Sequence, residues 1–275
     1  MSSSNFDVEE YLDRIRAQAK RALFEVKPIG FIEGFPLLVL RRPGQTPDQE
    51  PLASPTATVY LSAGVHGDEP AGPLALLRLF QQRWFSPDIE WTVFPLLNPT
   101  GMSLGKRENS RGEDLNRDYF LKNCSEVKAH REWLDNHCQP RNYDLSLMLH
   151  EDWEATGFYI YELAHDPALR IHTSMLQAAL HWVPLDLSET IDGHQAREGR
   201  IAPLEFEKFT LDNETDLPGA EAVYLSKYYT RLNYTLETPS ALPIATRVDT
   251  HVAVIQAAVE NFLKLPRDSG KPKNA

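Results

Sequence analysis

The stretch TVYLSAGVHGDEPAGPLALLRLFQQRWF, residues 58–85, decides the fold. Its first seven residues are apolar enough for a buried strand, and residues 70–85 have the apolar spacing of a helix. Between the two lies a Gly-rich turn that carries His66 and Glu69. A buried strand that passes through a turn straight into a helix is typical of α/β folds, which bind ligands beyond the carboxyl ends of their strands.

The rest of the chain continues this alternation of strands and helices. We expect two short strands within 29–43 around a turn at Glu33-Gly34, strands over 91–98, 143–150, 157–163 and 234–238, and helices over 7–23, 125–137, 168–182 and 250–265. Residues 98–120 and 183–222 are predicted to be loop-like. The pattern predicts an α/β fold with one mixed, largely parallel sheet flanked by helices. We expect a helical extension over 1–26, a single domain over 27–266 and a disordered tail over 267–275.

Composition narrows the class of protein. The 275 residues carry a net charge of −11, which is unfavourable for binding the phosphates of a nucleic acid. The N-terminus has early acids and no apolar core of a signal peptide, and no apolar run is long enough to span a membrane. The two cysteines, Cys124 and Cys138, are too few for a disulfide scaffold, and we expect both to be buried in the core. These features lead us to expect a cytoplasmic protein that binds neither nucleic acid nor membrane.

Three residues are candidate metal ligands. His66 and Glu69 lie three apart in the turn after the first buried strand, and His150 ends the predicted strand 143–150. All three would meet at one edge of the sheet, and two imidazoles with one carboxylate leave zinc a fourth position for water. Each residue also has a structural interpretation: His66 and Glu69 could cap and begin the helix, and His150 could be a satisfied histidine at the edge of the core.

Glu237 lies at the end of the predicted strand 234–238, so it reaches the same edge of the sheet. A carboxylate close to a metal can accept a proton from the attacking water and pass it to the leaving nitrogen. The alternative is a surface acid beside a turn.

The loop over 98–120 carries Arg107, Arg111 and Arg117, with Asn116 beside the last of them. The planar fork of arginine suits the recognition of carboxylates and oxyanions. The alternative is a basic surface loop whose arginines pair with the neighbouring acids.

In their order along the chain, these features resemble the zinc metallocarboxypeptidase family. That family includes pancreatic-type carboxypeptidases, bacterial murein peptide amidases, and the related aspartoacylase and succinylglutamate desuccinylase group. The segment H-G-D-E (66–69) resembles the family's H-x-x-E zinc motif, N-P-T-G (98–101) its N-P-D-G turn, and D-L-N-R (114–117) its D-x-N-R motif for the substrate carboxylate. The resemblance runs from about Ile29 to the final helix.

The resemblance implies a role for each residue. His66, Glu69 and His150 would bind one zinc ion per chain, with no second metal expected. Glu237 would be the general base and then the acid. The remaining three positions would act on the substrate: Arg107 would polarise the scissile carbonyl and stabilise the oxyanion, and Asn116 and Arg117 would hold a free carboxylate. Arg111 is a further candidate for substrate binding, although the short bacterial members give the second arginine of this run no fixed role.

The implied function is a zinc-dependent metallopeptidase or amidase that hydrolyses a peptide or amide bond next to a free carboxylate. The alternative is an N-acyl amino-acid deacylase, because that branch shares the zinc site; a third hypothesis is a non-catalytic binding module. The partner would be a small peptide or an acylated amino acid, and the oligomeric state stays open. If the acidic stretch 205–221 folds over the pocket, it would favour basic or neutral substrates; it could equally be a solvated loop.

Overall fold

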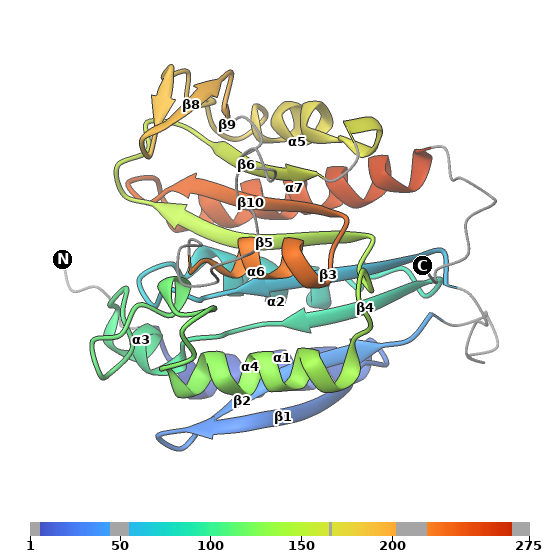
Figure 1. Cartoon of the computed structure of the whole chain (residues 1–275), viewed down its shortest axis with the longest axis vertical. Coiled ribbons are helices and arrows are strands. Elements are labelled where there is room, and N and C mark those ends of the chain that lie inside the picture. The colour runs from blue at the N-terminus through green and yellow to red at the C-terminus, as the bar shows by residue number, and fades with distance from the viewer. Residues whose placement is uncertain (1–5, 45–54, 165–166, 202–218, 266–275) are drawn as a thin grey trace.

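The computed structural model describes residues 6–44, 55–164, 167–201 and 219–265. In these ranges one sheet of ten strands has the order β1-β2-β4-β3-β5-β10-β6-β9-β8-β7 (Figure 1). Its strands are β1 (Glu25–Ile32), β2 (Phe35–Arg42), β3 (Ala57–Ala63), β4 (Ile89–Phe94), β5 (Leu145–Asp152), β6 (Tyr159–Ala164), β7 (Thr190–Ile191), β8 (His194–Arg197), β9 (Arg200–Ile201) and β10 (Leu232–Pro239). The helices are α1 (Val8–Arg21), α2 (Ala71–Gln81), α3 (Pro99–Leu104), α4 (Ser125–His137), α5 (His172–Ala179), α6 (Glu221–Tyr228) and α7 (Ile244–Lys264), with short 3-10 turns at Leu115–Arg117 and Pro167–Leu169.

The sheet is mixed, as the sequence predicts, and its centre is parallel. The neighbouring strands β4, β3, β5 and β10 pair in parallel, whereas β1, β2 and β6 pair antiparallel at the flanks. The four central strands are buried along almost their whole length, which explains why they read as nearly continuous apolar runs. Their carboxyl ends meet at one edge of the sheet, and this edge is where the candidate site lies (Figure 1).

Helices cover both faces of the sheet. In Figure 1, α1, α2, α5 and α7 lie behind it, and α4 and α6 lie in front. The larger hydrophobic core is on the side of α1, α2, α5 and α7, and a second core containing many tyrosines is on the side of α4 and α6. The amphipathic helix α1 buries one face in the larger core, and the hydroxyl of Tyr11 donates to the carbonyl oxygens of Pro73 and Pro95. The boundary between 1–26 and 27–266 stays a prediction.

Two-residue turns with glycine in second place close the hairpins. The predicted turn at Glu33-Gly34 is confirmed, and both of its residues have positive φ. The expectation of irregular chain over 183–222 is wrong for residues 190–201, where Asp192-Gly193 and Glu198-Gly199 join β7, β8 and β9 in the same way. These strands have only two to four residues, so no alternation of apolar and polar positions reveals them. The prediction also missed α3 and α6.

Some expectations fall on parts of the chain that lie outside the described residues. These are the tail 267–275 and the acidic stretch 205–221 apart from its last three residues. Cys124 and Cys138 are both buried and unpaired, as expected of small core residues. In the described ranges, no helix combines the length and the apolar character that crossing a membrane requires.

Candidate metal centre

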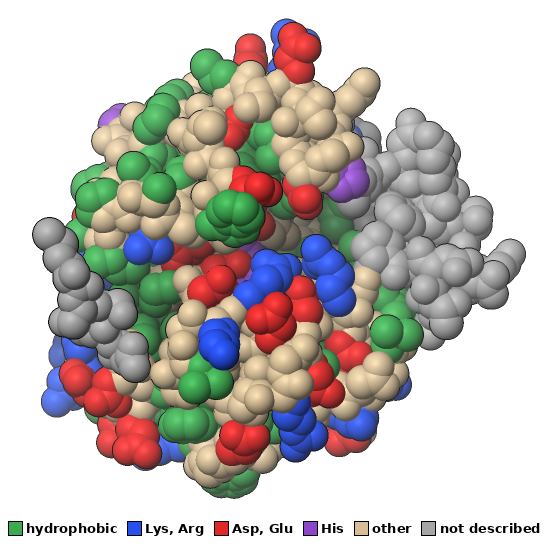
Figure 2. Space-filling model, turned by 90° about the vertical axis from the view of Figure 1, so that its left-hand side faces the viewer, with side chains coloured by type: hydrophobic (Ala, Val, Ile, Leu, Met, Phe, Trp, Pro, Cys, Tyr) green, Lys and Arg blue, Asp and Glu red, His purple; other side chains and the backbone are tan. Residues whose placement is uncertain are grey.

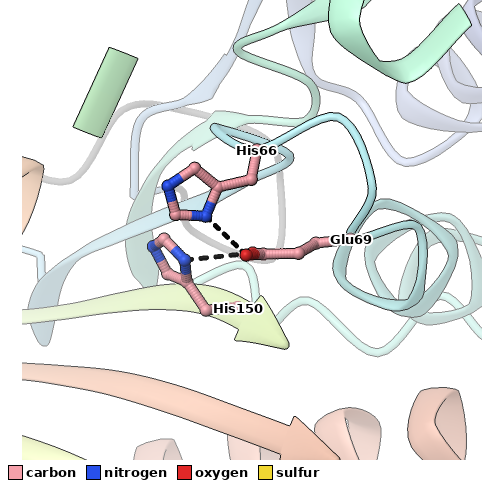
Figure 3. Close-up of side chains that lie close together, drawn as sticks. All are labelled: His66, Glu69 and His150. Atoms are coloured by element: carbon pink, nitrogen blue, oxygen red, sulfur yellow. Dashed lines mark hydrogen bonds and ion pairs between the residues drawn. The ribbon is translucent and has the colours of Figure 1, made fainter. Parts of the chain in front are cut away.

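His66, Glu69 and His150 converge at the carboxyl edge of the sheet. His66 follows β3, Glu69 precedes α2, and His150 lies in the neighbouring strand β5, which continues for two more residues. Each of the three offers a ligand atom, and these atoms lie within 4.8 Å of one another. The Nδ1 atoms of both imidazoles point at the Glu69 carboxylate, with the His150 atom 3.0 Å from Glu69 Oε2 (Figure 3). All three side chains are buried.

The turn that carries His66 and Glu69 packs closely against the loop that follows β4. A side chain at Gly67 would put its Cβ 2.0 Å from the carbonyl carbon of Gly101, so only glycine fits between the two candidate ligands. Asn98 forms the N-cap of α3 by accepting from the Gly101 N–H at 2.8 Å, and its side-chain amide donates to the Arg107 carbonyl at 3.2 Å. The predicted N-P-T-G turn is therefore the start of α3, and Asn98 connects it to the arginine loop.

The carboxylate of Asp114 lies close to the His66 imidazole, a contact that no sequence motif predicted. His66 Nε2 lies 3.5 Å from Asp114 Oδ1, and the other oxygen of the same carboxylate accepts from Arg107 Nε at 3.0 Å. A carboxylate behind a ligating imidazole fixes the tautomer and the direction of its lone pair. The pairing therefore favours a proton on Nε2 and leaves Nδ1 free to bind a metal.

The electrostatics of this cluster are those of a cation site. Burial opposes the ionisation of the Glu69 carboxyl, but the imidazoles of His66 and His150 outweigh burial and lower its pKa. Burial likewise favours neutral imidazoles, yet the nearby carboxylates raise the pKa of His66 to about 9 and also raise that of His150. Among the described residues, the buried Glu69 Oε2 has His150 Nδ1, at 3.0 Å, as its one polar contact. Two imidazoles and an incompletely satisfied carboxylate fit a divalent metal ion.

The raised pKa of His66 couples the stability of the metal-free protein to pH. A group whose pKa is raised by folding stabilises the fold below its ordinary value of 6.5 and loses that contribution as the pH rises through about 9. We expect chelated protein to lose about 1–3 kcal/mol of unfolding free energy over this interval. Urea denaturation at both ends of the interval measures the loss, and His66→Gln, which lacks the titrating ring, is the control. The same pH dependence in both proteins would contradict this coupling.

Glu237 lies directly beside the histidine cluster. It is the register partner of His150 across the parallel pair β10–β5, so both side chains are on the same face of the sheet. Its side chain is buried and makes no hydrogen bond or ion pair with the other described residues. Burial and the nearby Glu69 carboxylate raise the pKa of the Glu237 carboxyl, against the opposing effect of His150. A buried, unpaired carboxylate of this kind is suited to exchanging a proton.

These residues line a cavity of about 810 Å³ that opens on the face shown in Figure 2. Arg107, Asn116 and Arg117 line its wall on the side of the arginine loop. The Asn116 side-chain oxygen accepts from the backbone N–H of Glu221 at 2.9 Å, which ties this wall to the start of α6 and leaves the amide N–H groups available. Arg111 is exposed and is not among the residues that line the cavity, so the structure does not bring it to the site.

The opposite wall of the cavity is acidic. It is formed by the β5–β6 turn, the segment before β7 and the β7–β8 hairpin, and its acids are Asp152, Glu154, Asp186 and Asp192. None of these acids has an ion pair with a described lysine or arginine, and the hydroxyls of Tyr159 and Tyr161 donate to Asp152 and Asp192. In Figure 2, red side chains lie above the central hollow, and blue ones lie below it among further red side chains. The sequence pattern did not predict this wall, because the hairpin that completes it was expected to be irregular.

Comparison with known proteins gives results that agree with this architecture. The family model of the succinylglutamate desuccinylase/aspartoacylase catalytic domain matches residues 55–203, more than half of the chain. Carboxypeptidase SOL1 of Arabidopsis thaliana is 36% identical over 102 residues, which cover 32% of this chain but only 19% of that protein.

Two crystal structures extend the comparison to the whole fold. One, from Shewanella amazonensis and assigned to the metallopeptidases, has a TM-score of 0.76 at 24% identity and covers 95% of this chain and 97% of its own. The other is a metallo-carboxypeptidase from Burkholderia cenocepacia, with a TM-score of 0.66 at 18% identity, covering 93% of this chain and 69% of its own.

The fold is that of the metallopeptidase and metallo-carboxypeptidase structures just described. The family match shows that the chain belongs to the succinylglutamate desuccinylase/aspartoacylase catalytic-domain family.

Proposed function

We propose that this protein is a zinc-dependent amidohydrolase that cleaves a peptide or amide bond next to a free carboxylate. The observation that carries the proposal is the convergence of His66, Glu69 and His150 with the unpaired carboxylate of Glu237 in one cavity. His66 and His150 through their Nδ1 atoms, and Glu69 through its carboxylate, would hold a single zinc ion. When bound, zinc supplies Lewis acidity, which makes water a better nucleophile and a carbonyl a better electrophile.

Two residues of this chain would carry the proton and the developing charge. Glu237 accepts the proton of the attacking water and then donates it to the leaving nitrogen, so it acts first as base and then as acid. Arg107 lines the cavity beside His66 and keeps a permanent positive charge. Its guanidinium, held at Nε by Asp114, would stabilise the oxyanion that forms as the carbonyl is attacked.

Asn116 and Arg117 would bind the free carboxylate of the substrate. Arg117 lines the cavity and donates to the Asn116 carbonyl at 3.1 Å, which directs the arginine side chain along this wall. Its guanidinium has no carboxylate partner among the described residues and is therefore available to an anion. A carboxylate held here would put the adjacent amide bond at a fixed distance from Glu237.

The opposite, acidic wall would select the remainder of the substrate. Asp152 and Asp192 face the cavity with only neutral hydrogen-bond donors as partners, so they would attract a cationic group and repel an anionic one. This favours a peptide or amide with one carboxylate over a substrate that is anionic at both ends. The second candidate, an N-acyl amino-acid deacylase, is favoured by the family model, whose namesakes include succinylglutamate desuccinylase.

A substrate panel with zinc-loaded protein separates the two candidates. We expect kcat/KM for peptides with a neutral or basic residue beside the scissile bond to exceed that for N-succinylglutamate and N-acetylaspartate by about tenfold or more, because like charges across an interface are strongly unfavourable. Stopped assays of amine release at low salt measure both classes. Hydrolysis confined to acylated aspartate or glutamate would replace the first candidate with the second.

A matched pair of variants tests the acidic wall itself. Asp192→Asn removes one charge from the cavity, and Glu198→Gln removes one from the other Gly-containing turn of β7–β9, outside the cavity lining. We expect kcat/KM for a basic peptide to fall about two- to fivefold in Asp192→Asn, the effect of one exposed charge pair, and to be unchanged in Glu198→Gln. The difference in kcat/KM between the two variants should become smaller as salt is added. Equal values for the two variants would remove Asp192 from substrate selection.

A further inference from the structure

His150 and Glu151 are consecutive residues of β5, and both reach the short segment that contains Glu69. Successive side chains of a strand point to opposite faces, so the two approach this segment from different sides. His150 Nδ1 lies 3.0 Å from Glu69 Oε2, and Glu151 Oε1 accepts a hydrogen bond of 2.6 Å from the backbone N–H of Ala71. His150 thus contacts the Glu69 carboxylate directly, and Glu151 holds the backbone two residues after Glu69.

The start of α2 depends on this contact with Glu151. The N-cap residue, Pro70, provides no side-chain hydrogen bond, so the helix has no local cap for its free N–H groups. The Glu151 carboxylate supplies an acceptor from a different strand, and a negative charge at a helix N-terminus is favourable. The side chain of Glu151 is completely buried, so water cannot replace it as the acceptor.

Arg247 of α7 fixes the orientation of the Glu151 carboxylate. Its Nη1 donates to Glu151 Oε2, which leaves Oε1 directed at α2. The arginine also compensates the buried charge, since an isolated carboxylate at this position would be strongly unfavourable. The three elements α2, β5 and α7 therefore meet at one carboxylate behind the metal ligands.

We propose that Glu151, oriented by Arg247, is a positioning residue: by holding the backbone at Ala71, it fixes the Glu69 carboxylate and thereby sets the affinity of the site for its metal ion. The inference rests on the proposed metal site and concerns residues that do not touch the metal. Groups that orient metal ligands typically change metal affinity by about 10–100-fold when they are replaced.

The test compares Glu151→Leu with Glu151→Gln and wild type. Zinc dissociation constants are measured by competition with a chromogenic chelator, and the visible absorption of the Co²⁺-loaded proteins reports the ligand geometry. We expect Glu151→Leu to bind zinc about 10–100-fold more weakly, with an altered Co²⁺ spectrum. Glu151→Gln keeps an oxygen that can accept from Ala71, so its affinity should stay within about threefold of wild type. Circular dichroism of the metal-free proteins verifies that each variant is folded.

The outcomes separate this inference from the proposed function. Wild-type affinity and spectrum in a folded Glu151→Leu protein would overturn the inference and leave the metal site intact, whereas a wild type that binds no metal would overturn both. If Glu151→Leu does not fold, Arg247→Met is compared with Arg78→Met, since Arg78 forms the ion pair with Asp249 that joins α2 to α7 away from the ligands. We expect at least fivefold weaker zinc binding in Arg247→Met only, and equal affinities would overturn the inference.

Discussion

Replacing Glu237 by glutamine should abolish nearly all turnover while leaving metal binding unchanged. Glutamine has the same shape and fills the same buried space on β10, but it cannot accept the proton of the attacking water. The loss of general base and acid catalysis corresponds to a fall in kcat of about 10²–10⁴-fold. Steady-state kinetics on the best substrate of the panel, together with metal analysis of the same preparation, measures both halves of the prediction.

A nearby acid provides the control for Glu237. Asp152 lines the same cavity at the end of β5, beside Pro239 of β10, and accepts a hydrogen bond from Tyr159. We expect Asp152→Asn to lower kcat by less than about tenfold, because it changes the charge of the wall without removing the proton acceptor. Full activity in Glu237→Gln, or equal losses in the two variants, would exclude Glu237 as the general base.

Removal of the metal should abolish activity and lower thermal stability together. Without its Lewis acid the site loses several kcal/mol of transition-state stabilisation, so activity should fall by about 10³-fold or more and return on addition of zinc. Zinc at a hundred times its dissociation constant stabilises the fold by about 2.7 kcal/mol. For a chain of this size we expect a rise in Tm of about 5 °C or more, measured by differential scanning fluorimetry with and without chelator.

A ligand variant is the control for metal removal. His150→Ala lacks one of the three buried donors, so its Tm should respond little to zinc or chelator. The opposite outcome is that wild type purified without chelator holds less than one metal ion per several chains and gains neither activity nor stability when zinc is added. That outcome would favour a non-catalytic binding module that keeps the fold.

The parts of the site that could be predicted from the sequence are the residues that lie at the ends of recognisable strands. His66, His150 and Glu237 each lie at or near the carboxyl end of a strand that is recognisable from its apolar run, and neighbouring parallel strands bring such ends together. Glu69 follows His66 closely enough to be included. For these residues, local pattern and the general geometry of α/β sheets predicted a shared position, whereas their proposed roles came from the family resemblance.

Other parts of the site depend on contacts between segments that are distant in the sequence. Asp192 reaches the cavity only because a short hairpin extends the sheet, and strands of two residues have no periodic pattern. The contact between Glu151 and Arg247 joins residues 96 positions apart. Arg111 and Arg107 are arginines of the same polar loop, yet only Arg107 lines the cavity. The conformation of a loop is determined by hydrogen bonds that cannot be predicted from a sequence motif.

The most direct test of the metal centre is anomalous diffraction from crystals grown with zinc, recorded on both sides of the zinc absorption edge. We predict a single strong anomalous peak at bonding distance, about 2.0–2.2 Å, from His66 Nδ1, His150 Nδ1 and the Glu69 carboxylate. A strong peak bound elsewhere on the chain, or none at this cluster when zinc is in excess, would contradict it.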